Sequence, residues 1–594
     1  MNISNLIRNR ILTFLLKIFT FIPRNIFILL FLSFVSQAEI KISIQGVNSE
    51  IENNISAYLG TNDYNCQAAQ SQMDVYVDNI HNKILKAIRP FGYYSPSVKV
   101  TLLTQSKNCR KMNINIVLGK SITVNKIQFT LSSEGHKNQD FQNLEQQIPI
   151  KKGDILVDNI YERYKSSLMD KATELGYIDA HFIKSKIDVY PDKYEADIII
   201  HFDMGVRYRI ENIETIQTPV FLNERFIMKM ITLKQGDYFK NSQLYQLRKK
   251  LASTGYFDQV SIEVDYAHRN QGSVPLLIKL TPGNRIKYST GIGFSTDTGA
   301  RMSFDYKQDR ITDFGYQLNS KFSLSTVISE VTTGIKIPTK SKPLAKWYNL
   351  DTGFRRERTD TASSDTTKVG LSQTRIRENK WQNINFIDLV NEKFDTGDGQ
   401  IRSLLIVPGT SWSYTKADNP RIPMKGYKIY TNIRGASDTL LSDVSFVQIN
   451  FGYKSIYPLG TNRLIYRGQL GTTLIKQDIT QLPSSYRFYT GGDNSVRGFN
   501  YNTLSPVNAE GDALGGKHLF ISSLEYEQRM SSQWALAVFT DVGNAFSDNF
   551  TLKKSVGAGL RWFSPIGPVR LDVGFPLNDD KTDFQIHITV GPDL

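Results

Sequence analysis

The chain lacks the features that would indicate an enzyme, a nucleic-acid-binding protein or a helical membrane protein. Its 594 residues include two cysteines and seven histidines, and His81, His181 and His201 stand apart from any nucleophile or carboxylate motif. Beyond residue 38 no run of ~20 apolar residues occurs, so no transmembrane helix is expected there. The net charge is +14, but the basic residues are scattered rather than grouped, which argues against nucleic acid as a partner. The sequence therefore predicts no enzymatic activity, no cofactor and no metal site.

Residues 1–38 have the pattern of an export signal. Basic residues precede the apolar run "NIFILLFLSFV", and the small residues Ser36 and Ala38 fit a cleavage site after Ala38. An uncleaved anchor helix is the alternative, although Lys17 and Pro23 interrupt the apolar stretch. We expect a cleaved signal peptide and hence an exported protein.

Export affects the expected oxidation state of the two cysteines. Exported chains fold in an oxidising compartment, and an even number of cysteines there favours a disulfide between Cys66 and Cys109. Two separately buried free thiols remain the alternative.

The first half of the chain contains three similar units. The segments "RPFGYYSPSV", "TELGYIDAHF" and "ASTGYFDQVSI" recur at intervals of roughly 80 residues, each after a helix-like stretch and before strand-like alternation. The glycine fits the left-handed position that ends a helix. Each unit is predicted as a small α+β domain with the order strand, helix, helix, strand, strand. The expected boundaries are 39–119, 120–205 and 206–283.

Residues 284–594 show a different pattern, with alternating apolar and polar residues that continue to the C-terminus. Ile286 and Tyr288 begin one apolar face, and Ile586 and Ile588 belong to another. A soluble β-sandwich shows the same alternation, but about 310 residues are too many for one sandwich and suit a barrel of 16 strands. The prediction is a 16-stranded antiparallel transmembrane β-barrel.

The same alternation assigns charged residues to the barrel interior. If the apolar residues of "LEYEQRM" and "ALAVFTDVGNAF" face lipid, then Glu525, Glu527 and Asp541 face inward, and Arg561 does so in "SVGAGLRWF". Carboxylates away from bulk water need cationic partners.

Several motifs together resemble the BamA-like outer-membrane assembly superfamily. "GGDNSVRGFN" is similar to the motif of its sixth loop, and "FTDVGNAF" and "GAGLRWFSPIGPVRLDVGFPL" are similar to its C-terminal strands. Three N-terminal units and the ending "GPDL" resemble the TamA branch in particular. This resemblance implies three POTRA domains before the barrel.

The resemblance also implies two functional regions. The sixth loop is expected to fold into the lumen, where Arg497 pairs with Glu525 and Asp541; the other members of its motif are Val496, Gly498 and Phe499. An arginine fork can bind two carboxylates and keeps its charge. A weak seam is expected between the first and last strands, formed by Ile286, Tyr288, Ser289, Ile586, Ile588 and Thr589.

The resemblance implies an assembly factor of the bacterial outer membrane with its POTRA domains in the periplasm. Its expected partners are client outer-membrane proteins such as autotransporters, the lipid bilayer and a TamB-like periplasmic protein anchored in the inner membrane. Phospholipid transport to the outer membrane is an associated expectation. The alternative is a two-partner secretion transporter for a dedicated substrate.

Overall fold

The computed structural model of the chain describes residues 41–60, 70–105, 109–132, 137–270, 272–359, 362–397, 399–564, 567–577 and 584–591. The expected signal peptide 1–38 and Cys66 lie outside the described residues, so the predicted disulfide to Cys109 stays a prediction. The chain divides into two compact units at Tyr208 and Arg209.

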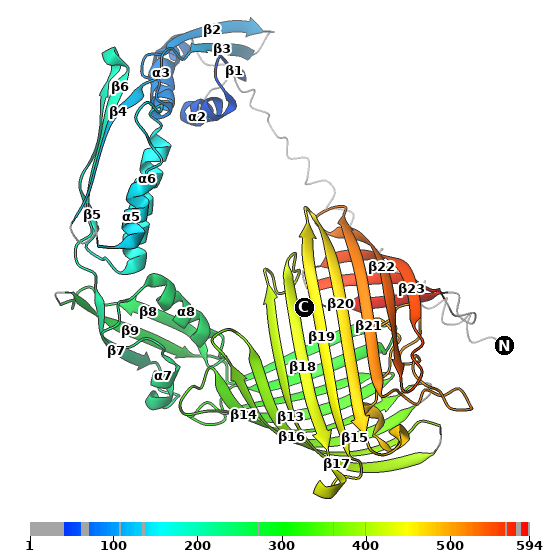
Figure 1. The fold of residues 1–594 in the computed structure, drawn as a ribbon. Helices are drawn as coiled ribbons and strands as arrows, with labels where there is room; N and C mark the ends of the chain where they lie inside the picture. Colours follow the sequence, from blue (N-terminus) through cyan, green and yellow to red (C-terminus); the bar gives the residue numbers. More distant parts are fainter. Residues whose placement is uncertain are drawn as a thin grey trace, which may run out of the picture. The chain divides into compact units, whose positions relative to one another are not determined.

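Each of the three repeats forms a three-stranded sheet covered by two helices (Figure 1). In every sheet the last strand of the repeat lies in the middle, parallel to the first strand and antiparallel to the other. The first repeat contains β1 Lys41–Gln45, α2 Ser49–Leu59, α3 Gln70–Ile88, β2 Ser97–Gln105 and β3 Cys109–Val117. The second contains β4 Thr123–Leu131, α5 Gln139–Gln146, α6 Asp158–Leu175, β5 His181–Tyr190 and β6 Glu195–Asp203. The third contains β7 Arg209–Gln217, α7 Glu224–Met230, α8 Asn241–Ala252, β8 Phe257–Val264 and β9 Ser273–Pro282.

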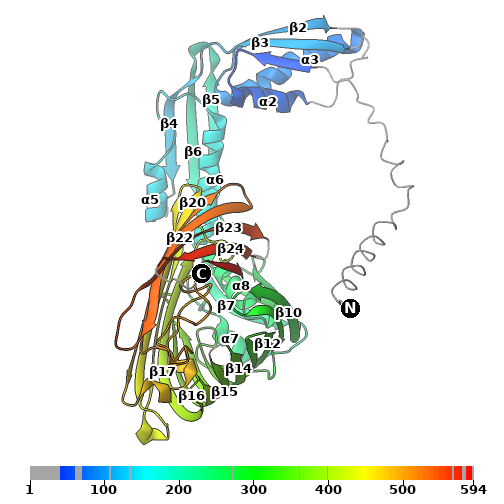
Figure 2. The same cartoon turned by 90° about the vertical axis from the view of Figure 1, so that its right-hand side faces the viewer.

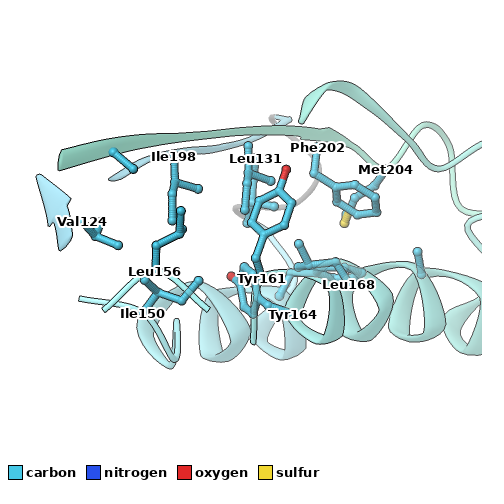
Figure 3. Packing of buried hydrophobic residues seen from close by; sticks show 14 of the residues in the cluster. Val124, Leu131, Ile150, Leu156, Tyr161, Tyr164, Leu168, Ile198, Phe202 and Met204 are labelled. Atoms are coloured by element: carbon cyan, nitrogen blue, oxygen red, sulfur yellow. The ribbon is translucent and has the colours of Figure 1, made fainter. Parts of the chain in front are cut away.

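The core of the second repeat shows how these sequences specify the unit. Tyr161, Tyr164 and Leu168 recur at helical spacing on one side of α6 and point toward the sheet (Figure 3). Ile198 and Phe202 project toward them from alternate positions of β6, the two-residue period of a strand. After α6, Gly176 adopts the left-handed conformation (φ +89°) that the recurring Gly-Tyr pair predicts.

A single 16-stranded sheet, ordered β10 to β25 in chain sequence, forms the second half (Figures 1 and 2). Every neighbouring pair is antiparallel, which confirms the predicted fold class; β10 and β25 approach each other, so the barrel is nearly closed. The first eight strands are β10 Ile286–Ser295, β11 Gly299–Gln308, β12 Gln317–Ser325, β13 Ile328–Pro338, β14 Lys346–Arg358, β15 Ser363–Ile376, β16 Gln382–Asp395 and β17 Gln400–Ala417. The last eight are β18 Gly426–Ala436, β19 Phe446–Leu459, β20 Asn462–Ile475, β21 His518–Arg529, β22 Trp534–Phe546, β23 Lys553–Ser564, β24 Gly567–Pro576 and β25 Gln585–Val590.

Burial along the strands separates a lumen face from an outer apolar face. On β22, Leu536 and Val538 are exposed on the outer side, whereas Ala537, Phe539 and Asp541 are buried. This alternation is the pattern of a barrel wall that meets lipid on one side. None of the helices in the described part of the chain is long and apolar enough to cross a membrane.

The third repeat docks on the barrel at the turn between β11 and β12. The Tyr256 hydroxyl donates to the carbonyl of Gly315 at 2.6 Å, and the amide of Gln317 donates to the carbonyl of Thr254 at 3.0 Å. Directly after β11, the buried carboxylate of Asp309 forms an ion pair with Lys287 of β10 at 2.6 Å. Burial first, and the charge of Asp309 second, raise the pKa of Tyr256, so this hydroxyl stays a donor.

Candidate functional site

The connection between β20 and β21, residues 476–517, folds against the barrel wall and is called loop six here. Its centre is the stretch that contains Val496 and Phe499, which are buried together with Leu504. Gly498 adopts φ +92°, and a Cβ on Gly574 of β24 would lie 2.6 Å from the Gly498 nitrogen. Glycine is therefore required at the crossing, because the loop backbone lies directly on the backbone of β24.

Arg497 makes the closest contacts of loop six with β22. Its backbone N–H and its Nε both donate to Asp541 Oδ2, at 3.0 and 2.8 Å, and Nη2 donates to Oδ1 at 3.1 Å. The guanidinium carbon lies 3.4 Å from the ring centroid of Phe539, so the cation also stacks on an aromatic face. Arginine suits this place because its planar fork engages both carboxylate oxygens at once.

The other side of the same guanidinium contacts β21 and β24. Arg497 Nη1 lies 2.7 Å from Glu525 and 3.1 Å from Asp572. Arg561 of β23 donates to these same two carboxylates, at 2.7 and 2.6 Å. Arg497 is thus joined directly to β21, β22 and β24, and through two shared carboxylates to β23. We call these residues, Arg497, Glu525, Asp541, Arg561 and Asp572, the lumen lock.

The lumen lock extends through charges that balance one another. Glu527 contacts Arg561 at 3.2 Å and pairs with Arg463 of β20, and Arg467 of β20 donates to the carbonyl of Ser495 at 2.8 Å. The four arginines at positions 463, 467, 497 and 561 face the four carboxylates at positions 525, 527, 541 and 572. Such pairing is what allows charges to be buried, since an uncompensated one is costly.

The sequence analysis named Arg497, Glu525 and Asp541 for this site, and the structure brings them together. It did not name Asp572, although the evidence was present in the sequence. Asp572 lies between the outward residues Leu571 and Val573 in "PVRLDVGF", the same alternation that assigned the other carboxylates to the interior.

A second contact set, which the sequence analysis missed, joins loop six to both ends of the barrel sheet. Asp493 accepts hydrogen bonds from Ser295 and Thr296, at the end of β10, at 2.7 and 2.8 Å. The same carboxylate contacts Nδ1 of His587 in β25 at 2.7 Å. The Gly498 N–H donates to the other ring nitrogen, Nε2, at 2.8 Å, so the imidazole carries its proton on Nδ1 and donates to Asp493. We call Asp493 and these partners the clasp.

The clasp lies where the sheet has no ladder. The strand order runs from β10 to β25 without a register between these two strands. Within the described residues, one hydrogen bond crosses from β25 to this end of β10: the Ile588 N–H donates to the side-chain hydroxyl of Thr296, the residue after β10, at 3.2 Å. A sheet edge of this kind presents unpaired N–H and C=O groups.

The seam lies further along β10 than the sequence analysis placed it. The hydrogen bond from Ile588 reaches Thr296, seven positions after Ser289. Ile286, Tyr288 and Ser289 pair with β11, and the hydrogen bond to β25 within the described residues is made at Thr296 instead. On β25, Ile586 is exposed and Ile588 and Thr589 are half-buried. The correction follows from the stagger between the two strands, which alternation does not reveal.

A third attachment holds the beginning of loop six on the opposite wall. Glu392 of β16 is fully buried and accepts hydrogen bonds from the Ser364 hydroxyl at 3.0 Å and from the Ser484 hydroxyl at 2.8 Å. Ser485 contacts the same carboxylate with its N–H at 3.1 Å and with its hydroxyl. No local signal marks this contact, because Glu392 and the two loop serines are about 90 residues apart.

Asp297, Asp493 and His587 are close enough together to be considered as metal ligands. Their donor atoms lie within 4.8 Å of one another. Both nitrogens of His587 already have hydrogen-bond partners, and the Asp297 carboxylate accepts the N–H of Asp493 at 2.8 Å. Hydrogen bonding within the clasp therefore accounts for this cluster without an ion.

Residues 277–593, more than half of the chain, match the Omp85 superfamily domain. The chain belongs to the Omp85 superfamily. Residues 41–118 match the family described as "POTRA domain TamA domain 1", and residues 208–283 match a POTRA family described as "Surface antigen variable number repeat". The first and third repeats are therefore POTRA domains by sequence.

Curated relatives in the superfamily agree at low identity. The chain is 23% identical over 463 residues to the outer membrane protein assembly factor BamA of Nitratidesulfovibrio vulgaris, covering 70% of this chain and 55% of that protein. It is 22% identical to BamA of Neisseria meningitidis, covering 88% of this chain and 72% of that protein. The chain thus spans little more than half the length of the first of these relatives.

Among solved structures, the chain is similar to BamA from Haemophilus ducreyi lacking POTRA domains 1–3. The TM-score is 0.64 at 15% identity, over 79% of this chain and 99% of that one. At this identity the likeness concerns the fold. The Omp85 superfamily and the 16-stranded barrel place the chain in the outer membrane, with its POTRA domains in the periplasm.

Proposed function

We propose that this Omp85 protein is an outer-membrane assembly factor that inserts client β-barrel proteins, such as autotransporters, through the seam between β10 and β25. The observation that carries the proposal is the missing ladder at this seam, in a sheet whose other neighbours are all paired. An unpaired strand edge can template an incoming strand through backbone hydrogen bonds. Insertion of a barrel into a membrane is downhill, so the proposed activity includes no enzymatic step and no cofactor.

The clasp supports this proposal because it closes the seam by side chains alone. Asp493 holds β10 through two hydroxyl groups and β25 through one imidazole. Breaking these few contacts would free both edges, whereas β10 would stay paired with β11, and β20 to β24 would stay joined through the lumen lock. Opening of the seam is thus compatible with an intact barrel.

Within the superfamily we assign the chain to the TamA branch. Three repeats precede the barrel, and the first matches a POTRA family described by the name of TamA. The assignment implies a TamB-like inner-membrane-anchored partner that reaches the POTRA domains, and a role in phospholipid transport to the outer membrane. Photo-crosslinking from the first POTRA domain in cells would identify the partner; capture of no inner-membrane-anchored protein would count against the TamA assignment.

A reversible disulfide across the seam tests the insertion function. Thr296→Cys and Ile588→Cys place thiols where the Ile588 N–H contacts the Thr296 hydroxyl across the seam, in a chain whose own cysteines are replaced by Cys66→Ser and Cys109→Ser. In proteoliposomes, the oxidised protein should insert a denatured client barrel much more slowly, and reduction should restore the rate. Insertion is measured as the appearance of heat-modifiable, folded client.

The matched control places the disulfide across an ordinary strand pair. Leu389→Cys and Ile406→Cys face each other in the ladder of β16 and β17 and should leave insertion unchanged. Undiminished insertion by the fully oxidised seam variant would refute the proposed route. The alternative function, secretion of a dedicated substrate through the lumen, would continue in the seam-crosslinked protein because its route does not cross the seam.

A further inference from the structure

A large cavity lies at the periplasmic end of the barrel, between the third POTRA domain and two short turns. Its volume is about 1240 Å³, and it is lined by the end of α7, the end of α8, the turn between β13 and β14, and the turn between β15 and β16. Neither the lumen lock nor the clasp contributes a residue to it.

The lining of this cavity is strongly basic. Eight of its side chains are lysine or arginine, among them Lys250 of the POTRA domain and Lys342, Arg377 and Lys380 of the two turns, and the acidic one is Glu378. None of the eight forms an ion pair with a carboxylate of the described residues. In the lumen lock, by contrast, Arg463, Arg497 and Arg561 each pair with a carboxylate. Cations that converge on a cavity without partners generate a positive potential suited to an anionic ligand.

The cavity also offers apolar surface beside these charges. Leu344 and Trp347, both half-buried, line it, and Lys336 lies 4.2 Å from the ring centroid of Trp347. A ligand that fits both kinds of surface carries a negative group and an apolar part. A free inorganic anion would leave the apolar surface uncovered.

The five tryptophans of the chain place this cavity at the level of the lipid head groups. All of them, positions 347, 381, 412, 534 and 562, lie toward the periplasmic ends of the strands, the side from which β10 leaves the third POTRA domain, with Trp347 on the lumen face of β14. Trp534 and Trp562 stack on the outer face with ring centroids 6.2 Å apart, and both are exposed there. Tryptophan concentrates at the membrane interface, so this girdle marks the periplasmic head-group layer.

We propose that the cavity binds the phosphate-bearing head group of an anionic lipid from the periplasmic leaflet of the outer membrane. The basic side chains contact the phosphate, and Leu344 and Trp347 contact the apolar part of the lipid next to it. Basic pockets at membrane interfaces bind anionic head groups in this way. The inference is independent of insertion through the seam, because the cavity is distant from it; it deepens the proposed phospholipid role and rests on it, and lipid labelling can fail while seam insertion stands.

The test uses the full-length protein in nanodiscs of zwitterionic phosphatidylethanolamine doped with a photoreactive phosphatidylglycerol. After irradiation, mass spectrometry should find label on peptides that contain residues 339–347 or 375–381. The variant Lys342→Gln with Arg377→Gln removes two exposed charges of the cavity and should lower this labelling by about tenfold. The control variant Arg421→Gln with Lys425→Gln removes one arginine and one lysine, both exposed, from the β17–β18 turn at the same end and should not change it.

Two further arms distinguish the source of the anion. Labelling should persist in millimolar inorganic phosphate and in the presence of a polyglutamate peptide, because neither covers the apolar surface. Complete displacement by phosphate, or by the acidic peptide, would overturn assignment of the site to a lipid. Equal labelling of the cavity variant and of the wild type, or equal labelling by a photoreactive phosphatidylethanolamine, would overturn it too.

Discussion

Two regions of the barrel wall are held together by different means. Between β16 and β17 a continuous ladder runs from Gln382 opposite Ser413 to Asp395 opposite Gln400. Between β10 and β25 the clasp on Asp493 takes the place of the ladder. A ladder depends on backbone groups that every residue except proline supplies, so it tolerates substitution. The seam depends on a few side chains, so single substitutions can weaken it while the rest of the wall stays intact.

The largest effect is expected from Arg497→Ala, because it removes the cation that anchors loop six, and with it the clasp, to β21, β22 and β24. Three carboxylates lose a partner within a buried network, and breaking a buried ion pair in this way costs about 3–5 kcal/mol. The barrel should lose its heat-modifiable form at a lower temperature in detergent. Arg402→Ala, on the exposed side of β17, is the control and should shift the transition little. A transition of Arg497→Ala equal to that of the control would contradict the lumen lock.

A smaller and more local effect is expected from Asp493→Asn. The amide keeps one acceptor but loses the charge that three partners share, and a hydrogen bond to a charged group contributes about 1.5–3 kcal/mol. Hydrogen exchange should therefore accelerate in peptides from β10 and β25 and stay unchanged in β16 and β17. Asp548→Asn, at an exposed loop position, serves as the control. Uniform acceleration around the barrel would show that the clasp is not specific to the seam.

The smallest effect is expected where the third POTRA domain supports the first strands. Tyr256→Phe removes the hydroxyl that donates to Gly315, a neutral hydrogen bond that contributes about 0.5–1.5 kcal/mol. Faster hydrogen exchange is expected in the turn at residues 309–316, with the lumen lock unaffected. Tyr245→Phe, on the exposed side of α8, should leave that turn unchanged. An identical exchange rate of residues 309–316 in both variants would mean that the Tyr256 hydroxyl does not stabilise the contact between the third POTRA domain and the barrel.

The parts of this molecule that the sequence predicts are those encoded locally. Alternation over a few residues is sufficient to assign Glu525 and Asp541 to the interior, because successive side chains of a strand point to opposite faces. Repetition of the Gly-Tyr pair is sufficient to mark three domains. The position of the seam on β10, the contact of Asp493 with His587 and the basic cavity depend instead on strand stagger and on the path of loop six. Those are set by packing between residues tens to hundreds of positions apart, which no local pattern reports.

The matched charges of the lumen lock have a consequence for the permeation of ions. Four arginines and four carboxylates, of which Arg497 comes from loop six and the rest from β20 to β24, give the lumen lock no net charge. Ions that enter the lumen would therefore meet a narrow, electrically neutral obstacle rather than a charged filter. Any preference for cations or anions in single-channel recordings must then arise from lumen residues elsewhere, and Arg497→Ala, which unbalances the set by one charge, should shift that preference toward cations.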